Sequence, residues 1–130
     1  MTYIHYPFIG IDELKFGMDR NTAKLTAEKL RYTLVNHLDD RAVGVELQFD
    51  KGDRLQGVVL HNPAALKIGS VVYSLPIDID KIVSLDDSHH YYHIGTEIFP
   101  RIGLAMRDYT KDSETLLILS YCSGYFGKSA

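Results

Sequence analysis

The strongest constraint in this sequence is a pair of strands joined by a tight polar turn. Residues 43–49 place apolar side chains at every second position: Val43, Val45, Leu47 and Phe49. A period of two is typical of a strand with one buried face. Residues 50–53 (DKGD) form a turn in which we expect Gly52 to take a positive φ, and residues 55–61 return as a second strand. The segment is therefore predicted to be a β-hairpin.

A helix is predicted before this hairpin, after an irregular entry segment at residues 3–16 that holds at most a short strand. Asp19 or Asn21 can cap its first turn, because their side-chain oxygens accept from free backbone N–H groups. Apolar residues then recur at steps of three or four: Ala23, Ala27, Leu30 and Leu34. This spacing predicts a helix from about Arg20 to about Val35.

The second half of the chain offers similar elements. Residues 70–75 suit a short strand that Pro76 ends, and residues 77–85 suit a helix with Ile79, Ile82 and Leu85 facing inward. Residues 90–99 suit an extended segment. Residues 102–109 and 114–121 flank the polar turn 110–113, which predicts a second hairpin.

The two hairpins align weakly when Gly44 is placed over Gly103, and each follows a predicted helix. This pattern suggests an internal pseudo-repeat, at about residues 11–61 and 77–121. We therefore expect a single domain over residues 1–130 with an α+β fold. Its single antiparallel sheet would be built from two helix-hairpin units, with the helices packed on one face.

Charge and cysteine content narrow the class of protein. The 130-residue chain has a formal net charge of −3, which argues against direct binding of nucleic acid. Cys122 is the one cysteine, so neither an internal disulfide nor a cysteine-based zinc cluster can form. Residues 1–15 do not read as a secretory signal, and we expect no membrane helix because no apolar run reaches the roughly 18 residues that one needs. We expect a cytoplasmic bacterial protein that needs no cofactor.

An acidic segment next to aromatic residues is the best candidate for a partner-binding surface. Residues 76–88 carry four acids and one base. Two tyrosines follow directly. Acids beside exposed aromatic rings suit a surface that meets a basic protein, since the field speeds encounter and the rings supply contact area. The predicted partner-binding residues are Asp78, Asp80, Asp86, Asp87, Tyr91 and Tyr92.

A histidine cluster supports a different hypothesis. His89, His90 and His93 follow two aspartates, and either a strand or a helix would bring two of the imidazoles to one side, where they could bind a metal. The glutamate of an H-E-x-x-H site is missing, so a polar loop that leads into an edge strand is the simpler interpretation. Cys122 has no base nearby in the sequence, and we expect it to be a small apolar residue near the end of a strand.

Several short motifs resemble small bacterial immunity-type proteins, the antidotes of toxin/immunity pairs. Residues 14–20 (LKFGMDR) look like the family's helix start, and residues 44–55 resemble its hairpin with an Asp-x-Gly turn. Residues 102–105 (IGLA) are similar to its late strand, and Gly124-Tyr125-Phe126 to its aromatic-glycine tail. The resemblance implies a cytoplasmic protein that binds and blocks a cognate toxin, often a nuclease, and that has no catalytic residues.

Together these observations favour a non-catalytic immunity protein whose partner is a basic toxin domain. The alternative is a small enzyme that uses the histidine cluster, with or without a metal. Assembly into a homo-oligomer such as a homodimer is compatible with the binding hypothesis.

Overall fold

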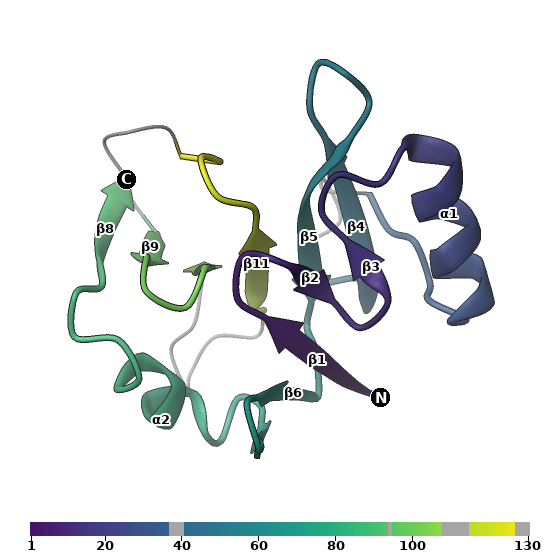
Figure 1. Cartoon of the computed structure of the whole chain (residues 1–130). Helices are drawn as coiled ribbons and strands as arrows, with labels where there is room; N and C mark the ends of the chain where they lie inside the picture. Colours follow the sequence, from purple (N-terminus) through teal and green to yellow (C-terminus); the bar gives the residue numbers. More distant parts are fainter. Residues whose placement is uncertain (37–40, 94, 108–114, 127–130) are drawn as a thin grey trace.

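The computed structural model describes residues 1–36, 41–93, 95–107 and 115–126, and these residues form two β-sheets and two helices (Figure 1). The first sheet has the strand order β3-β2-β1-β6-β7. Its strands are β1 (Thr2–Tyr6), β2 (Gly10–Ile11), β3 (Leu14–Lys15), β6 (Ala65–Ile68) and β7 (Val71–Ser74). All its neighbouring strands are antiparallel except β1 and β6, which are parallel.

The second sheet is antiparallel throughout and has the order β4-β5-β11-β10-β9-β8. Its strands are β4 (Gly44–Phe49), β5 (Leu55–His61), β8 (His90–His93), β9 (Thr96–Phe99), β10 (Leu104–Arg107) and β11 (Leu117–Tyr121). The helices are α1 (Arg20–Lys29) and α2 (Ile79–Val83). Figure 1 shows α1 beside β3 and β4, whereas α2 lies at the opposite end of the molecule.

The predicted fold class is therefore wrong. The described residues form two sheets instead of one, they are mostly strand, and the two helices lie at opposite ends of the molecule (Figure 1). The entry segment supplies three strands, and β1 pairs with β6 some sixty positions away (Tyr3 opposite Leu66). That pairing is non-local, so no periodicity within either strand reveals it.

The first hairpin is confirmed as β4 and β5, although its turn differs from the prediction. Gly52 does not take the positive φ; Asp53 does, at 60°. The Asp50 carboxylate organises the turn, because its Oδ1 accepts from Gly52 N at 2.8 Å and from Arg54 N at 3.0 Å. This arrangement is typical of aspartate in turns, where the short side chain replaces a backbone acceptor.

The first helix is confirmed from Arg20, with Asp19 Oδ1 accepting from Thr22 N at 2.8 Å, but it stops well short of Val35. Arg31 has a φ of 61°, which ends the helix, and residues 33–35 extend along β4. Val45 N donates to Thr33 O at 2.8 Å, and Val35 N donates to Val45 O at 3.0 Å. Residues 33–35, which were predicted to be helical, therefore pair with the outer edge of β4 instead.

The other elements match the sequence in part. The short strand before Pro76 is confirmed as β7, and α2 buries Ile79 and Ile82 as expected, whereas Leu85 is 43 % exposed. The extended segment at residues 90–99 proves to be two paired strands, β8 and β9. The second hairpin is confirmed as β10 paired with β11, and its turn at residues 110–113 lies outside the described residues.

One hydrophobic core fills the space between the two sheets. Its buried members come from both sheets and both helices: Tyr3, Ile11, Leu14, Ala23, Val45, Leu55, Val58, Leu60, Leu66, Tyr73, Ile79, Ile82, Phe99, Leu104, Met106, Leu116 and Ile118. Alternation along the strands produces this core, because every second side chain of β4, β5, β10 and β11 faces the first sheet.

A buried polar pair links the sheets inside this core. His5 of β1 and Ser120 of β11 are 1 % and 0 % exposed, and His5 Nδ1 lies 3.0 Å from Ser120 Oγ. His5 Nε2 lies 2.6 Å from the carbonyl oxygen of Ile102, so Nε2 donates and Nδ1 accepts from the serine hydroxyl. Burial lowers the pKa of His5 to about 4, so the imidazole is neutral near pH 7 and offers one donor and one acceptor nitrogen.

Acid should therefore destabilise the fold through His5. The unfolded chain binds a proton near pH 6.5 and the folded chain near pH 4, so stability is full above pH 6.5 and falls as the pH drops towards 4. At pH 5 we expect a loss of roughly 2 kcal/mol relative to pH 7.5. Urea unfolding of the wild type and of His5→Gln at both pH values measures this loss of unfolding free energy. An equal pH effect in His5→Gln would contradict the assignment.

Candidate functional site

The acidic residues predicted to bind a partner prove to have different structural roles. Asp86 is fully buried, and its carboxylate accepts from Ser88 N at 2.9 Å, from Ser88 Oγ at 2.6 Å and from Arg101 N at 2.7 Å. Burial alone would raise the pKa of Asp86, but these hydrogen bonds outweigh it and hold the pKa below its usual range. Asp86 thus ties the turn after α2 to the turn after β9.

Asp78 closes the end of β7. Its backbone N–H donates to Ser74 O at 2.7 Å, and its Oδ2 accepts from Ser74 N at 2.8 Å. The hydrogen bond from Ser74 lowers the pKa of Asp78, and Lys81 Nζ lies 3.4 Å from its other oxygen. The Asp78 carboxylate therefore has a structural role, and the sequence alone did not reveal it.

The remaining members of the predicted surface are accessible. Asp80 is exposed on α2, and the Asp87 side chain is 84 % exposed, 2.9 Å from Arg101 Nη1. Tyr91 on the edge strand β8 is 72 % exposed. The side chain of Tyr92 lies outside the described part of the structure.

Exposed apolar residues occur in the same stretch of chain. Ile77 is 76 % exposed and Leu85 is 43 % exposed. Together with the accessible residues above they define what we call the 77–91 surface: Ile77, Asp80, Leu85, Asp87 and Tyr91. Apolar side chains interleaved with carboxylates have the composition of a protein-binding surface.

The histidines of the cluster have separate partners. His89 Nδ1 lies 2.5 Å from Oε1 of Glu97, a carboxylate that is 3 % exposed, and the His89 ring stacks at 5.4 Å on Phe99. His90 Nδ1 lies 3.2 Å from Ser88 O. The side chain of His93 lies outside the described residues, and within those residues no three histidine, cysteine or acidic side chains gather as metal ligands.

Cys122 follows β11 and is partly buried. Its N–H donates to Gln56 O at 2.9 Å, and burial raises the pKa of the thiol. A raised pKa keeps the sulfur protonated near neutral pH, which is the opposite of what a cysteine nucleophile needs.

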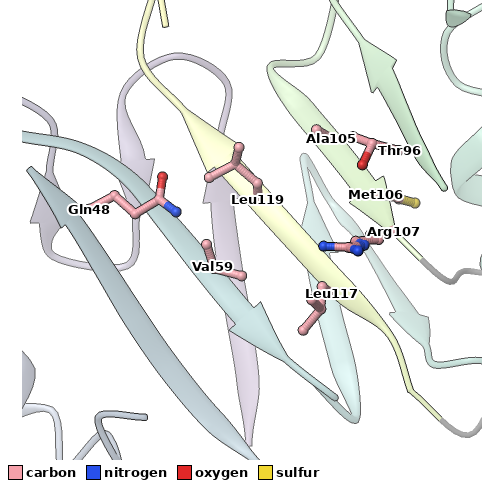
Figure 2. A pocket seen from close by; sticks show the side chains of 8 residues that line it. All are labelled: Gln48, Val59, Thr96, Ala105, Met106, Arg107, Leu117 and Leu119. Carbon is pink, nitrogen blue, oxygen red and sulfur yellow. The ribbon is translucent and has the colours of Figure 1, made fainter. Parts of the chain in front are cut away.

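A depression on the outer face of the six-stranded sheet was not predicted. It has a volume of about 180 Å³, and Figure 2 shows the side chains that line it: Gln48, Val59, Thr96, Ala105, Met106, Arg107, Leu117 and Leu119. Its floor is apolar and comes from β5, β10 and β11. A signal was present in the sequence, since residues 116–121 (LLILSY) are apolar at nearly every position rather than at alternate ones.

A row of polar side chains borders the depression. The Tyr125 hydroxyl donates to Gln48 Oε1, and Gln48 Nε2 donates to Glu46 Oε2 at 3.4 Å. Glu46 Oε1 lies 3.0 Å from Nε2 of His61, which is buried. His61 Nδ1 has no hydrogen-bond partner among the described atoms. These side-chain hydrogen bonds fix the positions of the polar residues on the β4 side of the outer face.

Within the described residues, no helix is long and apolar enough to cross a membrane. Comparison of the chain with protein-family models, with characterised proteins and with solved structures found no match. The resemblance to immunity-type proteins therefore rests on the short motifs in the sequence.

Replacement of Asp86 should damage the fold more than replacement of its exposed neighbour. Asp86→Ala removes a buried carboxylate that accepts three hydrogen bonds from Ser88 and Arg101, so we expect a loss of roughly 2–4 kcal/mol in the free energy of unfolding. Asp87→Ala removes only an exposed ion pair and should cost less than about 0.5 kcal/mol. Chemical denaturation of both variants measures the difference. Similar small losses would show that Asp86 is not a structural anchor.

Proposed function

We propose that this protein is a non-catalytic binding protein of the immunity type, which inhibits a cognate bacterial toxin domain in the cytoplasm. The observation that carries the proposal is the 77–91 surface, where exposed large apolar side chains and exposed carboxylates follow one another along the chain. Asp86 and Asp78 are excluded from direct contact in this scheme, because the fold itself uses their carboxylates.

Ile77 and Tyr91 are suited to supply most of the binding energy. Each exposes more than two thirds of its surface in the free protein. Full burial of one such side chain is worth roughly 1.5–3 kcal/mol, and tyrosine is a common hot-spot residue at interfaces.

Asp80 and Asp87 are suited to steer a basic partner. The exposed pair between Asp87 and Arg101 is worth little in water, so a partner cation can replace it at small cost. Negative potential on the surface raises the association rate more than the final affinity, and salt weakens that effect.

The pair of His89 and Glu97 favours a second candidate function, a metal-dependent or histidine-dependent enzyme. A buried carboxylate that fixes an imidazole is the arrangement by which proteins orient metal-ligating and general-base histidines. Elemental analysis of protein purified without a histidine tag tests this alternative. Near-stoichiometric transition metal, lost in His89→Ala, would favour the enzyme over the inhibitor.

Single substitutions on the 77–91 surface should weaken toxin binding selectively. The partner to test is the product of the neighbouring upstream gene, which the proposal requires to be a toxin. Tyr91→Ala and Ile77→Ser should each raise the Kd at least about tenfold, which corresponds to roughly 1.4 kcal/mol. Leu25→Ser is the matched control, because Leu25 is 65 % exposed on α1, away from this surface. Calorimetric titration measures all three variants. Equal effects of the three substitutions would place the interface elsewhere.

Reversal of the charges at Asp80 and Asp87 distinguishes long-range attraction of the partner from direct contact with it. Asp80→Lys with Asp87→Lys should slow association by roughly tenfold at low salt and flatten its salt dependence, with a smaller change in dissociation. Stopped-flow measurements at several salt concentrations provide the rates. An unchanged association rate would show that the partner does not approach through these carboxylates, and failure of the wild type to inhibit the toxin would refute the proposed function itself.

A further inference from the structure

Two adjacent inner strands of the six-stranded sheet, β5 and β11, carry apolar side chains on both faces. On β11, Ile118 is buried in the core, whereas its neighbours Leu117 and Leu119 face the depression. On β5, Leu60 faces the core and Val59 faces the depression. A sheet with one face in water normally alternates apolar and polar side chains, so this pattern indicates that the outer face is built to be covered.

The chain covers one end of that face itself. Tyr125 and Phe126, which follow β11, pack with Phe8 against Tyr121 and Ala105. Tyr121 contacts Phe126 edge to face, with ring centroids 4.9 Å apart. The aromatic cover shows the kind of contact that suits this face, and the depression is the adjoining part that the described residues leave open.

The rim of the depression carries one cation. Arg107 ends β10, where it lies opposite Thr96 on one side and Leu117 on the other, and Figure 2 shows it beside the apolar floor. Arg107 is exposed, and it makes no ion pair with any residue that the structure describes. The opposite rim is the amide of Gln48, whose oxygen already accepts from Tyr125.

We infer that this depression binds a segment of a partner protein that places one aliphatic or aromatic side chain on the floor and a neighbouring carboxylate on Arg107. The volume of about 180 Å³ suits a single large side chain. The guanidinium can hold a carboxylate with two parallel hydrogen bonds, which gives the contact direction as well as attraction. This site is separate from the 77–91 surface, so it does not depend on the proposed function.

The chemistry can be tested with a small probe. The acid 4-methylpentanoate joins a leucine-like chain to a carboxylate, and 4-methylpentanamide is its neutral match. In 15N–1H NMR titrations of the full chain at low salt, the acid should shift the amide signals of Val59, Arg107 and Leu119 and bind at least about threefold more tightly than the amide. Arg107→Gln should abolish that preference. Arg101→Gln should keep it, because Arg101 is an exposed arginine already paired with Asp87.

A second titration, with a peptide, tests whether the occupant is a protein segment. The acetylated, amidated peptide SGVLDVGS should bind at least about fivefold more tightly than 4-methylpentanoate, since its backbone adds contacts beyond one side chain. Equal affinity would contradict a protein occupant and point to a small carboxylic acid. Equal binding of acid and amide, or signal shifts centred away from β5, β10 and β11, would overturn the site. Displacement of residues 127–130, seen as shifts of their signals together with those of Leu119, would show that the chain's own tail is the occupant.

Discussion

The pairing of β5 with β11 is the interaction on which the rest of the structure depends. It joins two hairpins that are distant in sequence into one six-stranded sheet and lays their apolar sides on the five-stranded sheet. Its register places Val59 opposite Leu119 and Leu60 opposite Ile118. The core, the buried contact of His5 with Ser120 and the outer depression all follow from that one register.

Local signals predicted the hairpins and the start of the first helix, because alternation and capping act within a few residues. They could not predict the two-sheet arrangement, which depends on β1 lying beside β6. They also missed the end of the first helix, where tertiary contacts decide. The Tyr32 hydroxyl donates to the Asp12 carboxylate, and residues 33–35 pair with β4, so non-local bonds replace the last helical turns.

In the candidate site too, local sequence signals indicated some features, whereas others depend on contacts between distant residues. Sequence composition drew attention to residues 77–91, where Asp87 and Tyr91 are exposed, but it could not separate surface carboxylates from structural ones. Asp86 and Asp87 are neighbours with opposite environments, and only the turn geometry around Ser88 and Arg101 distinguishes them. The depression went unnoticed because an apolar run such as residues 116–121 also suits a strand that its own chain buries on both sides.

The contact between Asp78 and Ser74 has a consequence for the behaviour of the protein at high concentration. β7 is an outermost strand and carries the exposed side chains of Val71 and Val72, which makes it a template for joining sheets from different molecules. Asp78 occupies both the N–H and the C=O of Ser74 with its own carboxylate and N–H, and these are the groups that an incoming strand would use. The same aspartate that precedes α2 therefore blocks strand addition at the Ser74 end of β7.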